Sequence, residues 1–129
     1  MRYISLTNKG EINHTLIFKV YRMKGTHLGE FEELVLLICA LLPDSAYSVS
    51  VAEEMEKQTE RSITLSTVHT ALYRLEKKGF VESYMGGTTK DRGGRRKRLY
   101  KITATGFEAL NQAKEMRNRI WSMLPDYKF

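Results

Sequence analysis

The sequence predicts a mainly α-helical domain with one small β-hairpin. Three observations support this fold class: apolar residues recur at helical spacing in three segments between residues 30 and 79, two short strand-like segments follow, and a long amphipathic segment closes the chain. The 129 residues fit one domain, and a hydrophobic content of 42% is enough to build a core.

The first predicted helix covers residues 30–42, EFEELVLLICALL, which is apolar on nearly every side after its first turn. Glu30, Glu32 and Glu33 favour the positive end of a helix dipole. Pro43 ends the segment, so we expect a buried central helix.

Two further helices follow. Ser48 or Ser50 is expected to cap the second, and Ser50 would form an S-x-x-E capping box with Glu53. Thr64 is expected to cap the third helix, which ends at Gly79. The side chains predicted to face the core are Val51, Ala52 and Met55 in the second helix and Val68, Ala71, Leu72 and Leu75 in the third. The opposite face of the third helix is polar: Ser66, Thr67, Thr70, Tyr73, Arg74 and Lys77.

A hairpin with a basic tip is predicted next. Residues 80–85 and 99–103 form its strands, and glycine pairs at 86–87 and 93–94 interrupt the segment between them. Residues 90–101 contain seven basic residues and one acid, so this segment accounts for the whole net charge of +6. A neutral body with one basic segment indicates a polyanionic partner, with nucleic acid ahead of an anionic membrane surface.

The last predicted helix begins at Thr105 and ends before Pro125. Its apolar stripe needs a partner, which we expect to be a second copy of the chain. The stripe comprises Phe107, Leu110, Ala113, Ile120 and Leu124, joined by Met116, Trp121 and Met123.

Three helices followed by a basic hairpin outline a winged helix-turn-helix, in which the third helix enters the major groove and the hairpin contacts the backbone or minor groove. We therefore divide the chain into an N-terminal arm (residues 1–28), a winged helix-turn-helix (29–103) and a C-terminal dimerisation helix with a short tail (104–129). Met23 is a candidate native start, because the pattern becomes regular just after it.

Between about Leu28 and Leu110 the chain contains the segments LGEFEELVLLICALL, AYSVSV, TVHTALYRLEKKGFVES, DRGGRRKRLYKIT and the closing T-A-T-G. Through these segments the chain resembles the PadR family of bacterial transcriptional regulators. The resemblance implies a homodimeric repressor of the short branch with a single C-terminal helix, and some family members bind flat aromatic effectors at the dimer interface. The chain departs from many members at His69, where they carry a tyrosine.

The predicted function is a sequence-specific DNA-binding regulator that binds an inverted-repeat operator as a dimer and is released by a small aromatic effector. The residues predicted to contact DNA are Thr64, Ser66, Thr67, Thr70, Arg74, Lys90, Arg92, Arg95, Arg96, Lys97 and Arg98. The residues predicted at the dimer interface are Phe107, Leu110, Ile120, Trp121 and Leu124, with Trp121 and Met116 as candidate effector contacts.

Several assignments stay open. The hydroxyl residues of the third helix are either base readers or ordinary surface, and Arg74 reaches either a phosphate or a carboxylate such as Glu76 or Glu60. His69 is expected to be partly buried rather than a ligand or sensor, and Cys39 to be a small core residue. His14, His27 and His69 have no metal-ligand spacing, so no metal and no cofactor are predicted.

The main alternative is a protein-interaction module whose basic hairpin docks on an acidic partner. An enzyme is not expected, because the chain contains no G-x-S-x-G, H-E-x-x-H or P-loop motif. The single cysteine and the absence of an apolar run long enough to span a membrane favour a cytoplasmic protein.

Overall fold

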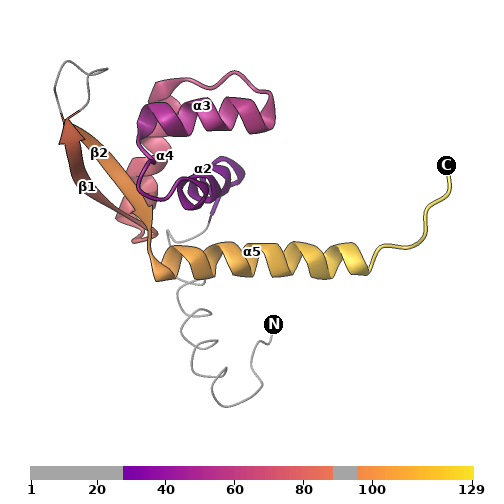
Figure 1. Ribbon diagram of the computed structural model, residues 1–129. Helices are drawn as coiled ribbons and strands as arrows, with labels where there is room; N and C mark the ends of the chain where they lie inside the picture. The colour runs from indigo at the N-terminus through magenta and orange to yellow at the C-terminus, as the bar shows by residue number, and fades with distance from the viewer. Residues whose placement is uncertain (1–27, 89–95) are drawn as a thin grey trace, which may run out of the picture.

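A computed structural model describes residues 28–88 and 96–129. The elements are α2 (Glu30–Leu41), α3 (Ser48–Thr59), α4 (Leu65–Lys77), β1 (Val81–Thr88), β2 (Arg96–Ile102) and α5 (Ala104–Ser122). Figure 1 shows α2, α3 and α4 as one group, with the hairpin on one side and α5 running beneath the group and extending well past it. The predicted mainly helical fold with one hairpin is confirmed.

Some predictions fall on residues that the structure does not describe. These are the N-terminal arm with its candidate start at Met23, His14 and His27, and the hairpin residues Lys90, Arg92 and Arg95.

The core lies where α2, α3 and α4 meet the base of the hairpin. The predicted inward faces of α3 and α4 are confirmed, because all seven of their predicted core side chains are buried. Phe80, between α4 and β1, is the largest fully buried side chain and is 1% exposed. Cys39 is also in this core, as predicted, and is 2% exposed. Within the described ranges no charged side chain is buried, and Tyr100, at 8% exposed, is the buried residue of this core that carries a hydroxyl.

The first turn of α2 holds two other helices by ion pairs. Glu32 accepts from the Lys78 ammonium at 2.6 Å, just after the end of α4. Glu33 accepts from the Arg117 guanidinium of α5, also at 2.6 Å. The acidic residues that favour the start of α2 therefore also fix α4 and α5 against it.

The start of α3 differs from the prediction. Tyr47 is the N-cap and Ser48 the first helical residue, so Ser50 is the third helical residue. The Ser50 hydroxyl accepts a hydrogen bond from the Tyr47 N–H at 3.0 Å, so Ser50 closes the turn from inside the helix and the predicted box with Glu53 is wrong. The prediction that Thr64 caps the third helix is confirmed, because its hydroxyl accepts from the Thr67 N–H at 3.3 Å.

Both strands of the hairpin are longer than predicted. β1 and β2 pair in antiparallel register from Val81 opposite Ile102 to Thr88 opposite Arg96, with an irregularity between Met85 and Thr88. The predicted segments were shorter because the added pairs carry polar side chains and glycines, which lack the apolar alternation of a strand. The basic residues 96–98 therefore lie on β2 itself.

A tight joint connects the hairpin to α5. The helix begins at Ala104, one residue earlier than predicted, because Thr103 is its N-cap and accepts from the Gly106 N–H at 3.0 Å. The Thr103 hydroxyl donates to the Gly79 carbonyl at 2.7 Å, and its N–H donates to the Phe80 carbonyl at 3.0 Å. Gly79 itself has φ +80°, a conformation that favours glycine.

The apolar packing of α5 on the other helices is confined to its first part, beyond which Arg117 still pairs with Glu33 of α2. Gly106, Ala109, Leu110 and Ala113 are its buried residues, and every residue from 114 onward is exposed. Leu110 is 7% exposed and belongs to the core of its own protomer, so its assignment to the dimer interface is corrected.

Candidate nucleic-acid interface

The exposed face of α4 is polar and is the face predicted to meet DNA. Because Val68, Ala71, Leu72 and Leu75 are buried, the side chains on the opposite side of the helix point outward. Ser66, Thr67, Thr70 and Arg74 are all exposed. Tyr73, which we had not included among the DNA contacts, is 61% exposed on the same helix. The Lys77 ammonium lies 5.5 Å from the centre of the Tyr73 ring.

The hydroxyl groups at the start of α4 differ in how much hydrogen-bonding capacity they leave for a ligand. The Thr64 hydroxyl caps the helix, and the Thr67 hydroxyl donates back to the Thr64 carbonyl at 2.8 Å. The Thr70 hydroxyl donates to the Ser66 carbonyl at 3.0 Å. Thr67 and Thr70 therefore offer a ligand only acceptor lone pairs and a methyl group.

A hollow of about 470 Å³ separates the first turn of α2 from the first turns of α4. Ser66, Thr67, Thr70 and Arg74 line it together with Glu30 and Glu32, so the structure brings four of the predicted residues together. Two carboxylates on the rim disfavour a phosphate here. The hydrogen bond from Arg61 lowers the pKa of Glu30, which therefore remains ionised.

Arg74 has a different carboxylate partner from those predicted. Its guanidinium lies 3.9 Å from a Glu32 oxygen, so neither Glu76 nor Glu60 is the partner. The side chain is 63% exposed and the ion pair is long, so Arg74 remains able to meet a second anion.

The three described hairpin residues that are predicted to contact DNA are held in different ways. The Arg96 side chain donates to the Gly86 carbonyl at 2.9 Å, across the hairpin. The Lys97 ammonium lies 4.1 Å from the centre of the Tyr47 ring, at the start of α3. The Arg98 guanidinium donates to the Ser83 hydroxyl at 2.9 Å. Their charges are thus distributed along one strand rather than gathered at the tip.

The base of the hairpin is fixed to the helices. The Tyr100 N–H on β2 donates to the Ala46 carbonyl, in the segment before α3, at 2.8 Å. The Ser83 hydroxyl on β1 donates to Glu76 of α4 at 2.8 Å. These bonds set the position of the basic strand relative to the polar face of α4.

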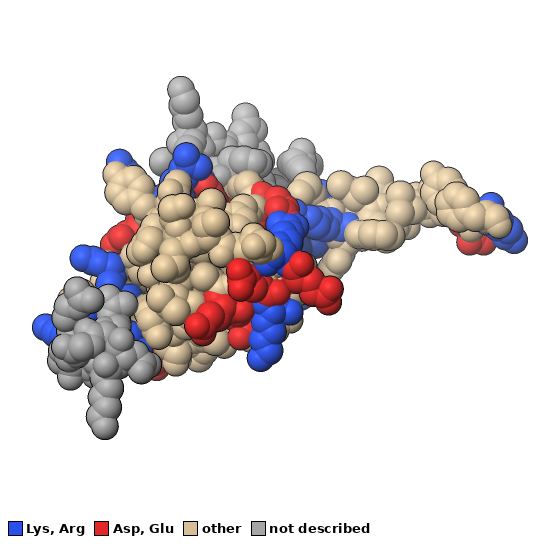
Figure 2. All heavy atoms as spheres, turned by 90° about the horizontal axis from the view of Figure 1, so that it is seen from above, with Lys and Arg blue, Asp and Glu red and all other residues tan. Residues whose placement is uncertain are grey.

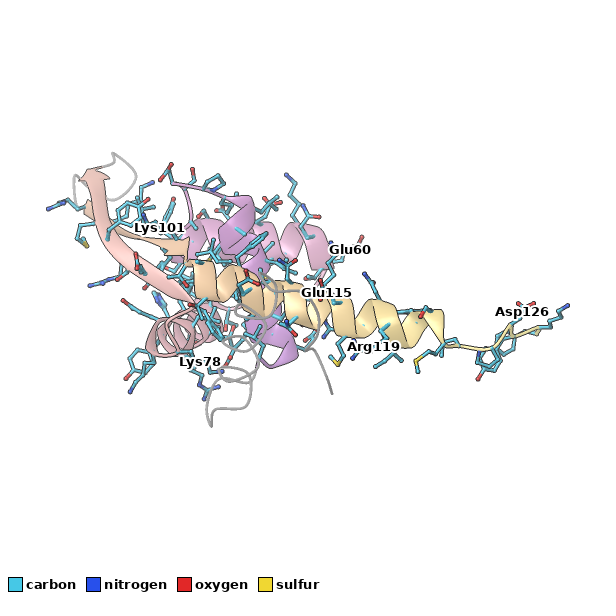
Figure 3. The ribbon with its side chains drawn as sticks, turned by 90° about the horizontal axis from the view of Figure 1, so that it is seen from below. Glu60, Lys78, Lys101, Glu115, Arg119 and Asp126 are labelled. Atoms are coloured by element: carbon cyan, nitrogen blue, oxygen red, sulfur yellow. The ribbon has the colours of Figure 1, made fainter. Side chains whose placement is uncertain are left out.

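The end of α5 and the tail carry exposed apolar side chains. Figure 2 shows the projecting part of the chain as mostly uncharged, with charged side chains again at its far end. In Figure 3, Arg119 and Asp126 lie on the part that extends past the other helices. Phe107 and Ile120 are 53% and 51% exposed, and Trp121 is 70% exposed. Met116, Met123, Leu124, Tyr127 and Phe129 are also exposed in the protomer.

The prediction for His69 is wrong, because His69 is exposed rather than partly buried. It lies on the side of α4 that faces β2 and lines a second, smaller hollow with Tyr47, Ser48, Arg98 and Tyr100. The helical period of α4 placed His69 between the polar and apolar faces, but the period does not say which neighbouring element lies beside that edge.

Neither a metal site nor a membrane span is found in the part of the chain that the structure describes. In residues 28–88 and 96–129, histidine, cysteine, aspartate and glutamate side chains form no group of three that would suit a metal ion. The same part of the chain has no helix with the length and apolar character of a membrane span.

The helices, the polar face of α4 and the basic strand beside it define a winged helix-turn-helix, a class of DNA-binding fold. Comparison with known proteins agrees with this class. The model of the PadR-like family of transcriptional regulators matches residues 37–112. The chain belongs to this family, and its description as a family of transcriptional regulators agrees with the prediction that the chain is not an enzyme.

Individual relatives are distant in sequence. An uncharacterised protein of Lysinibacillus sphaericus is 29% identical over 86 residues, which cover 65% of this chain and 74% of that protein. A PadR-like transcriptional regulator from Bacillus cereus shares the fold with a TM-score of 0.60 at 18% identity, covering 71% of this chain and 84% of that one. A PadR family regulator from Clostridium difficile has a TM-score of 0.59 at 24% identity, covering 73% and 93% of the two chains.

Proposed function

We propose that this transcriptional regulator is a dimeric, sequence-specific DNA-binding repressor that binds an inverted-repeat operator and is released by a small planar aromatic effector. The observation that carries the DNA-binding part is the position of the basic strand β2 beside the exposed polar face of α4. Repression and effector release rest on the family resemblance alone.

On DNA, the two elements have different roles. Arg96, Lys97 and Arg98 neutralise phosphates and release counterions, which gives affinity without sequence preference. Ser66 and Thr70 face base edges, and the Thr70 methyl group is suited to contact a thymine methyl because the hydroxyl proton is bonded to the Ser66 carbonyl. Lys90, Arg92 and Arg95 belong to the same basic segment of the sequence and add phosphate contacts.

In the dimer, the exposed apolar residues of α5 pack against a second copy of the chain. Phe107, Ile120, Trp121 and Leu124 provide this surface. A symmetric pair presents two α4 helices to successive major-groove turns, about 34 to 36 Å apart, which explains an inverted repeat with half-sites one helical turn apart.

The effector site lies between the two protomers, at Trp121 and Met116. An exposed indole beside a flexible thioether suits a flat aromatic ligand. Titration with planar hydrophobic dyes should quench Trp121 fluorescence, and an unchanged spectrum at saturating dye would remove this part of the proposal.

The decisive experiment is to incubate the purified chain with fragmented genomic DNA from its source organism at near-physiological salt, and to sequence the bound fragments. We expect an enriched inverted repeat. Lys97→Ala should then weaken binding to all sequences and lower the salt slope by about one for each half-site, whereas Lys57→Ala, at the far end of α3, should leave both unchanged. Uniform recovery with no motif would contradict sequence-specific binding and favour an acidic protein partner for the hairpin.

The dimer has its own test. Ile120→Glu places a charge in the proposed interface and should give a monomer in sedimentation at about 10 µM, because a buried unpaired carboxylate costs several kcal/mol. Asn118→Glu adds the same charge at an exposed polar position of the same helix and serves as the matched control. A dimer that persists in the Ile120→Glu variant would show that α5 does not form the interface.

A further inference from the structure

A second hollow lies beside the wing, where the start of α3, the side of α4 and β2 meet. Its volume is about 180 Å³, and it is lined by Tyr47, Ser48, His69, Arg98 and Tyr100. Every one of these side chains carries a hydrogen-bonding group. The volume holds several water molecules, and is therefore large enough for a phosphate group.

The hollow has a positive character. Arg98 supplies a permanent charge, and its bond to the Ser83 hydroxyl leaves the other N–H groups of the guanidinium for an anion. No carboxylate lines the hollow. Arg98 is linked to a carboxylate only through Ser83, whose hydroxyl donates to Glu76 at 2.8 Å. This hollow therefore differs from the larger one beside α2, which has two carboxylates on its rim.

Tyr100 adds a second, independent sign of a ligand. The residue is 8% exposed, yet its hydroxyl has no hydrogen-bond partner among the described residues. A phenol hydroxyl at the wall of a hollow, with no partner in the described protein, can donate a hydrogen bond to a ligand bound there. Burial raises the pKa of the Tyr100 phenol, so the group keeps its proton and can donate it to an anion.

We infer that this hollow, hereafter the wing notch, binds one phosphodiester group of the DNA backbone through Arg98, Ser48 and Tyr100, and that His69 adds a contact to the same phosphate when it is protonated. The inference rests on the proposed DNA-binding function and goes beyond it, because it makes DNA affinity depend on pH. Neutral histidine has one N–H donor, whereas its protonated form has two and a positive charge.

The groups around His69 set the sign of this effect. From β2 it faces Arg98 and Tyr100, and from the start of α3 it faces Tyr47, over which the Lys97 ammonium lies. On its own helix the neighbouring titratable groups are Tyr73 and Glu76. A phosphate bound in the hollow favours the protonated form of a histidine beside it. Binding therefore takes up a proton, and lowering the pH strengthens it.

The test uses the full chain and a fluorescein-labelled duplex of mixed sequence, about 30 base pairs long, because a phosphate contact needs no operator. Dissociation constants are measured by anisotropy from pH 6 to pH 8 at fixed ionic strength. We compare the wild type with His69→Gln, which cannot become charged, and His69→Arg, which is always charged. All three keep His14 and His27, so their differences report position 69. Circular dichroism checks that the variants are folded.

The wild type should gain about five- to twentyfold in affinity per wing notch from pH 8 to pH 6, relative to His69→Gln, which is the part of one hydrogen bond to a charged group that falls within this pH range. His69→Arg should bind tightly at both pH values. Equal pH profiles for the wild type and His69→Gln would overturn the proposed phosphate contact in the wing notch, and so would weak binding by a folded His69→Arg. Either result would leave the proposal of DNA binding itself intact. No binding to the duplex by the wild type at any pH would overturn both.

Discussion

The joint between Phe80 and the start of α5 provides a test of the packing. A Cβ added at Gly106 would clash with the Phe80 carbonyl oxygen, and would lie 3.0 Å from the Phe80 carbonyl carbon and 3.1 Å from Cγ1 of Ile102. Backbone atoms cannot turn aside as a flexible side chain does. In Gly106→Ala, the first turn of α5 must therefore move away from the base of the hairpin.

The cost can be worked out from its parts. Overpacking costs about 1–3 kcal/mol, and shifting the first turn weakens the Thr103 cap, which contributes about 1 kcal/mol. Alanine recovers about 1 kcal/mol through its higher helix propensity. We therefore expect Gly106→Ala to lower the free energy of unfolding by about 1–3 kcal/mol.

Urea unfolding followed by circular dichroism measures this change, with all variants at one protein concentration because the stability of a dimer depends on concentration. Gly87→Ala is the matched control, since a Cβ there meets nothing within 4 Å and should change stability by less than about 0.5 kcal/mol. If Gly106→Ala were as stable as the wild type, the close approach of α5 to Phe80 would be refuted.

Three other substitutions test further features. Gly79→Ala should cost about 1–2 kcal/mol in thermal unfolding because of its φ of +80°, with Gly79→Asn costing less; equal stability of all three proteins would contradict the left-handed turn. Thr64→Ala removes the N-cap of α4 and should lower the free energy of unfolding by about 1 kcal/mol, also measured by thermal unfolding. No loss would show that the cap does not stabilise the helix. Burial raises the pKa of the Cys39 thiol from the usual 9.0 to about 12, so the stability that this proton contributes is complete below pH 9 and is lost as the pH rises toward 12. Urea unfolding of the wild type should therefore weaken by about 1–2 kcal/mol more than that of Cys39→Ala between pH 8 and pH 10.5, and parallel losses would show that Cys39 is not buried as described.

Local patterns predicted most of the fold because each helix carries its own signal. In α4 the spacing of Val68, Ala71, Leu72 and Leu75, together with Thr64 at the cap, defined both the element and its buried face. The start of α3 was missed because Ser48 and Ser50 both suit a cap. The observed geometry makes neither of them the N-cap, because Tyr47, in extended conformation, takes that position.

Less of the candidate site than of the fold could be predicted from the sequence. The composition of the basic segment predicted a polyanion partner, but contacts between distant residues depend on tertiary packing. Arg74 lies 3.9 Å from Glu32, which is far away in sequence, and His69 lines the same hollow as Arg98 only because β2 returns beside α4. The one sequence signal for the wing notch was the histidine itself, on a helix predicted to enter the major groove, although the sequence predicted it to be partly buried.

The bond from Tyr100 to Ala46 and the chain from Arg98 through Ser83 to Glu76 join the hairpin to the helices at both of its strands. The distance between the basic strand and the α4 face is thus a fixed property of the protein. A duplex that contacts both must adjust its own groove width and curvature to that distance, at an elastic cost that varies with base sequence. Base pairs between the two contacts, which no side chain touches, would therefore influence affinity through their stiffness alone.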